Sequence, residues 1–231
     1  MKEAMYWTML AGSVLDTLLL VRVLGLRLQR IYAFITLDCL LSACLDWFSM
    51  YLGWDSRESF RVFAFTRFLY AALTPLIAWD VFEEVKLESA KIRRPEAARM
   101  VISLLVTAFL WVVLSVGLLF GDSSQAVDWP EATGPILWYA ACLFGMFFIW
   151  RTRRGLMKQG TNLPRNTTVW SLYYLLTWGC SMLGIVPELF NLKVNGDIFN
   201  MASNGWLMAC TIFCLFRLRG APAEVATVSR D

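Results

Sequence analysis

The sequence predicts an all-α membrane protein: one bundle of seven spanning helices, with the N-terminus outside and the C-terminus inside. Three observations lead to this prediction. Hydrophobic residues make up 58% of the 231 residues and charged residues 17%, and the mean hydropathy is +0.55, which is too apolar for an ordinary soluble domain. The apolar residues form blocks near the roughly 20 residues that a helix needs to cross about 30 Å of hydrocarbon. Lys and Arg are concentrated in alternate linkers.

The apolar blocks follow one another along the whole chain, so we expect a single domain. They lack the alternation of apolar and polar residues that a membrane β-strand shows, and helices are therefore predicted. The first block follows no basic segment and is long enough to span, so it is predicted to be a retained helix. The predicted spans are residues 4–24, 31–53, 60–81, 100–120, 134–150, 168–189 and 198–216, within a bundle of residues 1–220 that precedes a short cytoplasmic tail, residues 221–231.

The basic residues predict the orientation. Assigned alternately to two sides, the linkers place sixteen Lys and Arg on one side, and on the other only Lys2, Arg57, Arg61 and Lys193. Because cytoplasmic loops are enriched in Lys and Arg, the first side is predicted to be inside. This indicates a multi-pass protein of the cell membrane, a bacterial inner membrane by our interpretation. The net charge of +3 then reflects topology, and nucleic-acid binding is not expected.

The third span and the inner linkers contain residues with expected structural roles. Pro75 lies in the middle of the third span and predicts a kink there. The segment from Glu83 to Arg93 is rich in helix formers and is expected to extend the third helix beyond the bilayer. Asp80 and Glu84 lie at the inner end of this span, close to water, so no deep partner is expected for them. Asn166 begins a glycosylation sequon that the topology places inside, where it would be inert.

Arg67 is a guanidinium within the predicted third span, where an unpaired charge costs at least about 2.5 kcal/mol on insertion scales. Counted from the midpoints of their helices, Asp46 and Arg67 both lie roughly 6 Å toward the outside. Consecutive helices with a short outer linker are expected to be neighbours. We therefore predict an ion pair between Asp46 and Arg67.

Two further acidic residues, Asp16 and Asp38, have no basic partner within the predicted spans. If they approach each other, burial and mutual repulsion would keep one of them protonated, which predicts a proton or cation site between the first two helices. Polar residues at helical spacing extend this candidate site to the third and last helices. The alternative is that all of them are interhelical hydrogen bonds without a ligand. The additional candidates are Ser42, Tyr70, Thr74, Asn200 and Asn204.

The chain contains no histidine, which excludes bis-histidine haem ligation and zinc sites that use His. It also lacks a Gly-x-Ser-x-Gly motif and a metal-ligand cluster, so an intramembrane enzyme is the least favoured function. The polar interior favours a carrier or sensor for a small solute, proton or cation. The alternative is a non-catalytic accessory subunit that binds a cytoplasmic protein partner through its basic inner loops. No cofactor is expected.

Short segments resemble two groups of seven-helix proteins. The stretches TPLIAWD, WSLYYLLTW and GIVPE are similar to parts of microbial rhodopsins. That family carries retinal on a lysine of the last helix; the matching position here is Asn204, with Asn200 near the place of the counter-ion aspartate, so the resemblance implies no retinal. The stretches LQRIYAFITL and AWDVFEEV resemble small bacterial seven-span membrane proteins that have no assigned function. This second resemblance covers most of the chain in layout and implies no particular chemistry.

Overall fold

The structure is a computed structural model that describes residues 2–53, 56–88, 129–158, 160, 162–183 and 196–220. This part of the chain is helical and contains no strand, which confirms the predicted class. The long helices overlap six of the predicted spans. Residues 100–120, the end of the sixth span and the tail lie outside the described residues. The long helices are α1 (Lys2–Gly25), α2 (Ala33–Leu52), α3 (Arg57–Asp80), α6 (Trp129–Lys158), α7 (Arg165–Leu183) and α9 (Gly196–Arg217), with a short α4 (Glu83–Glu88) and a 3-10 turn, η1 (Leu28–Arg30).

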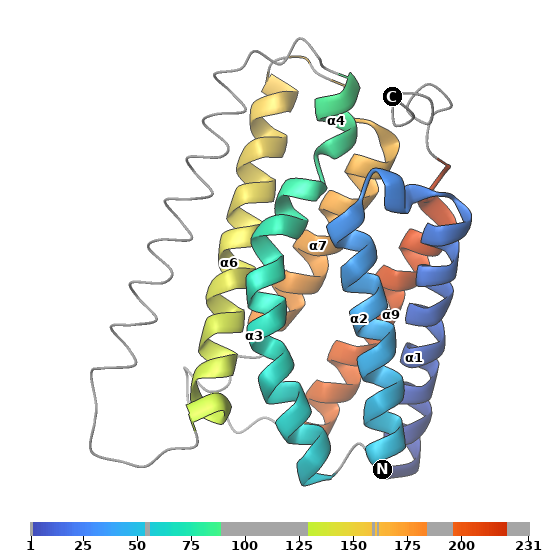
Figure 1. The fold of residues 1–231 in the computed structure, drawn as a ribbon, viewed down its shortest axis with the longest axis vertical. Coiled ribbons are helices and arrows are strands. Elements are labelled where there is room, and N and C mark those ends of the chain that lie inside the picture. The colour runs from blue at the N-terminus through green and yellow to red at the C-terminus, as the bar shows by residue number, and fades with distance from the viewer. Residues whose placement is uncertain are drawn as a thin grey trace.

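The long helices form a closed ring (Figure 1). Each one packs against the next in the order α1, α2, α3, α6, α7, α9, and α9 packs against α1. Helices α3 and α6 are neighbours that run in the same direction, whereas the other successive pairs of the ring up to α9 are antiparallel. The first and last described helices are thus side by side, and all six contribute side chains to one interior.

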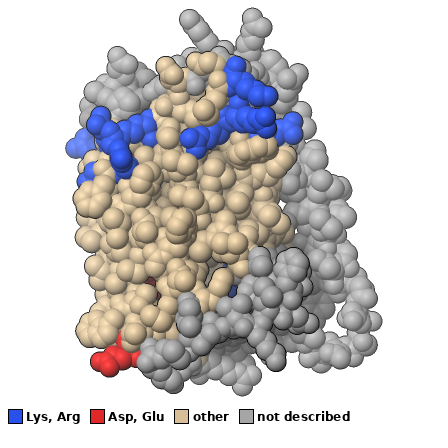
Figure 2. Space-filling view, turned by 180° about the vertical axis from the view of Figure 1, so that it is seen from behind, with Lys and Arg blue, Asp and Glu red and all other residues tan. Residues whose placement is uncertain are grey.

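Basic residues collect at one end of the ring, which we call the arginine-rich end. Helices α1, α3, α6 and α9 finish there, and α2 and α7 begin there (Figure 1). Figure 2 shows Lys and Arg as a band near this end, with a broad surface below it that lacks charged side chains. The described basic residues of the arginine-rich end are Arg22, Arg27, Arg30, Arg151, Arg153, Arg154, Lys158, Arg165, Arg217 and Arg219.

Large apolar side chains lie on the surface as well as in the core, and several polar side chains are buried. Those on the surface include Val21, Leu143 and Phe216, which are 59%, 58% and 78% exposed. Thr74, Thr167 and Ser171 are completely buried instead. Within the described residues, α1 from Glu3 to Gly25 and the whole of α2 are long and apolar enough to cross a membrane, and only 17% and 22% of their most apolar stretches are buried.

The connection between α1 and α2 depends on a residue from α3. Tyr32, the residue before α2, provides no side-chain cap for the first N–H groups of this helix. Asp80 does so: its Oδ2 accepts from the backbone N–H of Phe34 at 2.9 Å and of Ile35 at 3.0 Å. Asp80 is only 4% exposed, so the expectation that it has no deep partner was wrong. Because helix N-termini leave unpaired donors, a carboxylate from a neighbouring helix stabilises α2 as a cap.

The predicted extension of the third helix is interrupted. After Asp80, residues 81–82 form a turn, and the chain becomes helical again over α4, Glu83–Glu88. Pro75 lies within α3, whose helical assignment continues through it. The hydroxyl of Thr74 donates to the carbonyl of Tyr70 in the same helix at 2.8 Å. The kink at Pro75 stays a prediction.

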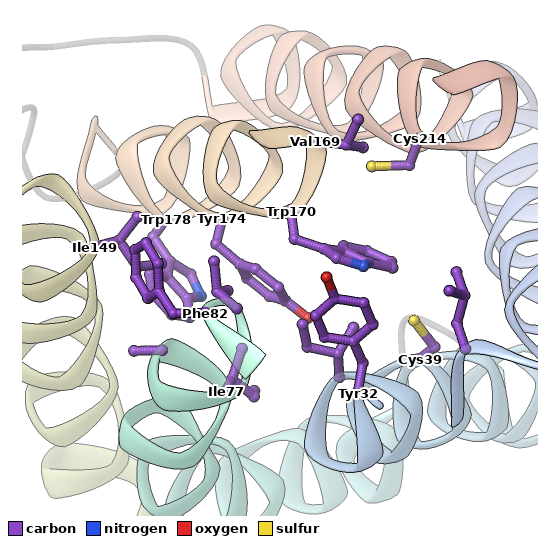
Figure 3. Close-up of a cluster of buried hydrophobic side chains, with 14 of the residues drawn as sticks. Tyr32, Cys39, Ile77, Phe82, Ile149, Val169, Trp170, Tyr174, Trp178 and Cys214 are labelled. Atoms are coloured by element: carbon purple, nitrogen blue, oxygen red, sulfur yellow. The ribbon is translucent and has the colours of Figure 1, made fainter. Parts of the chain in front are cut away.

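Aromatic side chains fill the interior toward the arginine-rich end. Trp170, Tyr174 and Trp178 project from α7 toward Tyr32, the residue before α2, and toward α3 and α6 (Figure 3). The ring of Tyr174 lies 4.9 Å from that of Trp178 and 6.2 Å from that of Trp170, measured between centroids. On α6, Gly145 lies directly against the Trp178 ring, where an added Cβ would overlap it. A side chain there is excluded by this close approach.

Candidate functional site

Two carboxyl groups meet where α1 and α2 pack together. Asp16 of α1 and Asp46 of α2 lie close enough to interact through their side chains, and both line one cavity. A third helix contributes Thr211 of α9, whose hydroxyl donates to Asp16 Oδ1 at 3.4 Å and to the Leu207 carbonyl of its own helix at 3.1 Å. Residues far apart in the sequence therefore converge on one acidic pair.

This carboxyl pair lines a cavity of about 300 Å³ between α1, α2 and α9. The volume is at the lower end of the range for small-molecule sites. Its polar lining comes from the carboxyl pair and from hydroxyl and amide groups, and Met9, Leu15, Leu207 and Met208 provide apolar walls. The other polar side chains of the lining are Thr8, Ser13, Asn204 and Thr211.

Neighbouring bonds hold the two helices in the register that brings the carboxyl groups together. Trp47, the residue after Asp46, donates its indole N–H to Thr17 Oγ1 at 2.9 Å, so the adjacent positions of both helices are joined as well. Ser13 and Thr17 donate their own hydroxyls to carbonyls one turn earlier in α1. Because these two hydroxyls already donate their hydrogens to backbone carbonyls of α1, the carboxyl groups are the side chains of these two helices left to bind a ligand in the cavity.

Two carboxyl groups this close can form a hydrogen bond with each other in one protonation state. An ionised carboxylate only accepts, so the bond forms when one member of the pair holds a proton and donates it. Two carboxyls in contact share one proton because both cannot ionise so close together at low cost. The arrangement can release that proton, take it up, or exchange it for a small cation that binds between the oxygens.

The predicted ion pair between Asp46 and Arg67 is not found within the described residues. Asp46 has Asp16 as its neighbour instead, and both line the cavity. The prediction matched the two residues by depth along their helices, but depth does not fix the direction around the helix axis. On the side of α2 that faces α3, the structure has two serines. The hydroxyl oxygen of Ser42 lies 3.1 Å from that of Tyr70, and the hydroxyl oxygen of Ser49 lies 2.9 Å from that of Ser59.

Asp38 has a different partner from the one predicted. Tyr174 of α7 donates its hydroxyl to Asp38 Oδ2 at 2.9 Å, and this bond crosses the interior between helices that are not neighbours in the ring. Asp16 affects Asp38 electrostatically, but its hydrogen bond is with Thr211, and it shares the cavity with Asp46. The sequence analysis missed Tyr174. A tyrosine within an apolar helix needs a partner for its hydroxyl, and this rule could have identified it.

The remaining predicted site residues fall into separate places. Asn204 lines the cavity with the carboxyl pair. Ser42 and Tyr70 bond to each other, and Thr74 bonds within α3. The side chain of Asn200 lies outside the described residues. The four-helix polar site is therefore split, and Asp16, Asp46 and Asn204 are the residues named in the sequence analysis that share the cavity.

A second polar cluster, at the arginine-rich end, was not predicted as such. Asn166 is buried and donates from Nδ2 to Glu84 Oε1 at 2.8 Å and to the Arg219 carbonyl at 3.1 Å. Its Oδ1 accepts from the Arg219 N–H at 3.0 Å. Glu84 is 3% exposed and bonds to Asn166, so the expectation that this carboxylate lies in water and needs no deep protein partner was wrong. The sequon asparagine instead joins α4, α7 and the end of α9.

Comparison with models of protein families, with curated proteins and with solved structures finds no match for this chain. The resemblance to small bacterial seven-span proteins stays a prediction. In the described residues there is also no group of three or more Cys, Asp or Glu placed to hold a metal ion. The candidate site is therefore argued from its own residues.

Proposed function

We propose that this chain is a multi-spanning membrane protein that binds a proton or a small cation at the Asp16–Asp46 carboxyl pair, as a carrier or sensor. The observation that carries the proposal is the pair itself, two neighbouring carboxyls that line the same cavity of about 300 Å³. Ionisable groups within spanning helices normally face the bundle interior and belong to ion or proton sites.

Placement in a membrane is supported by the surface of the ring. A broad apolar exterior is unfavourable in water, where the exposed apolar area would drive association, and favourable in hydrocarbon. The band of Arg and Lys at one end, with a broad uncharged surface beside it, fits the cytoplasmic border of a bilayer (Figure 2). The N-terminus, at the opposite end, would then lie outside (Figure 1).

The direction of the helices supports an additional crossing. Helices α3 and α6 are parallel neighbours, so the chain has to return to the starting end before α6 begins. The predicted fourth span, residues 100–120, is long enough to provide that crossing. Together with this fourth span, the six long helices make up the seven spans of the proposed topology.

The topology is tested with reporter fusions. A reporter that works only in the cytoplasm should be active when fused after Lys158, at the arginine-rich end, and inactive when fused after Gly53, at the other end. Carbonate washing should leave the unfused protein in the membrane fraction. Equal reporter activity at both sites, or release of the protein by carbonate, would contradict the proposed placement.

The carboxyl pair is tested by infrared spectroscopy of the purified protein in acidic and alkaline buffers, with and without Na⁺. A protonated carboxyl band that disappears at alkaline pH and responds to Na⁺ is expected. Asp16→Asn and Asp46→Asn should each remove it, because the proton is shared.

Asp38→Asn is the matched control, since it removes a carboxyl of α2 that bonds to Tyr174 and does not line the cavity. The control should keep the Na⁺-sensitive band. A band unchanged in both pair variants would reject the site, as would its absence from the wild-type protein. Melting midpoints of the three variants show whether each is folded.

A further inference from the structure

We propose that the cluster of Arg165, Arg217 and Arg219 binds the phosphate headgroup of an anionic phospholipid. The inference rests on the proposed membrane placement and concerns a different part of the molecule from the carboxyl pair. It assigns the lipid to the junction of α7 and the end of α9, on the arginine-rich end of the ring.

The three arginines are brought together by bonds to the backbone at the end of α9. Arg165 Nε donates to the Arg217 carbonyl at 3.0 Å, and Asn166 holds the backbone of Arg219 through both its N–H and its carbonyl. From α1, Arg22 Nη2 donates to the Leu218 carbonyl at 3.0 Å. Leu218 itself is buried, with 1% exposure. The segment that carries Arg217 and Arg219 is therefore fixed in position beside Arg165.

The cluster has positive charge in excess of its neutralising partners. All three side chains are exposed, and within the described part of the chain none of them forms an ion pair with a carboxylate. Desolvation, followed by repulsion from Arg219 and Arg217, lowers the pKa of Arg165. A guanidinium has five N–H donors, and the bond from Arg165 to Arg217 uses one of them. The remaining donors match the oxygens of a phosphate group, which arginine binds through paired hydrogen bonds.

Apolar side chains beside the cluster indicate a lipid as the source of the phosphate. Phe216, next to Arg217, is 78% exposed, and Val21 and Leu24, on either side of Arg22 in the adjacent helix, are 59% and 44% exposed. An anion-binding cluster followed directly by an apolar surface is what a phospholipid requires, with its headgroup at the arginines and an acyl chain along α1 and α9. A free phosphate ion would use only the first of these features.

The test is native mass spectrometry of the full chain released from mixed micelles that contain equal amounts of phosphatidylglycerol and phosphatidylcholine. The wild-type protein should retain phosphatidylglycerol preferentially. Arg217→Gln together with Arg219→Gln should reduce this retention on the order of thirtyfold, because each basic residue near an anionic lipid contributes roughly a factor of five. This double variant keeps every bond described above, because those bonds use the backbone of residues 217 and 219.

The matched control is Arg151→Gln together with Arg154→Gln, which removes the same charge from the same end of the ring. These two arginines lie over the Phe147 and Trp150 rings of their own helix, 6.0 and 5.4 Å from the ring centroids, and outside the cluster. The control should retain the lipid as the wild type does. Equal losses in both double variants would show a non-specific charge effect and overturn the proposal.

Inorganic phosphate provides the second arm of the test. If it displaces phosphatidylglycerol at millimolar concentration, the site recognises the free anion and the lipid assignment is wrong. The reporter fusions separate this inference from the proposed function. A protein that spans the membrane but shows no lipid preference contradicts only the headgroup site, whereas a protein that does not span contradicts both.

Discussion

The close approach of α6 and α7 at Gly145 gives a prediction that can be calculated from the structure. A Cβ at this position would lie 2.7 and 2.8 Å from Cη2 and Cε3 of Trp178, and closer still to Cζ3. Trp178 is 4% exposed and stacked beside Tyr174, so its ring has little room to move. Gly145→Ala therefore adds one methyl group where the core is already filled.

Two opposing effects determine the size of the change. Alanine is better than glycine within a helix by about 1 kcal/mol. Overpacking a filled core costs typically about 1–3 kcal/mol. Gly155→Ala, in the same helix, provides the first effect alone, because nothing lies within 4 Å of a Cβ added at Gly155. The Gly145 variant should thus be less stable than the Gly155 variant by about 1–3 kcal/mol.

Thermal unfolding of the purified protein measures this difference. For a chain of this length, 1 kcal/mol corresponds to about 2–4 °C in the midpoint, so the two variants should differ by roughly 2–12 °C. Adding Trp178→Phe removes the ring atoms that overlap and should make the Gly145→Ala substitution far less costly in that background. Equal midpoints for the two alanine variants, or a cost at residue 145 that Trp178→Phe does not change, would refute the packing argument.

Three further predictions concern hydrogen bonds between helices, and melting midpoints test each. Asp80→Ala removes the cap of α2 and should cost about 2 kcal/mol, with Asp80→Asn less harmful because it keeps an acceptor oxygen. Asn166→Asp sets a second carboxylate against Glu84 and should cost at least about 3 kcal/mol at neutral pH. Its deficit relative to Asn166→Ala should shrink as the pH falls, since protonation removes the repulsion; a pH-independent difference would contradict this. Tyr174→Phe should cost about 1 kcal/mol through loss of its hydroxyl bond, and Tyr173→Phe, for which the structure shows no such bond, should cost clearly less.

The positions of the helices could be predicted from the sequence because they depend on local composition. Residues 4–24 and 31–53 were expected to be helical, and α1 and α2 cover Lys2–Gly25 and Ala33–Leu52. A run of apolar residues of the right length determines a helix regardless of its neighbours. The predicted inward direction of Asp16, Asp46 and Asn204 also agrees with the cavity, because an ionisable or amide group is costly against lipid.

The partners of the polar residues could not be predicted, because they depend on rotation about each helix axis and on which helices meet. Two residues at equal depth, such as Asp46 and Arg67, can point to different neighbours. Asp38 bonds to Tyr174 across the ring, although the two residues lie 136 positions apart in the sequence. No periodicity along one helix contains that information.

The cap that Asp80 provides for α2 has a consequence for synthesis at the ribosome. The residues that it caps are made 46 and 45 positions earlier, so α2 leaves the ribosome with its first amides unsatisfied. Until the end of α3 emerges, water or translocon groups have to occupy those donors. The two helices are accordingly expected to become stable as one hairpin. A nascent chain arrested before Asp80 emerges from the ribosome should be more accessible to protease near Phe34 than one arrested after Asp80 has emerged.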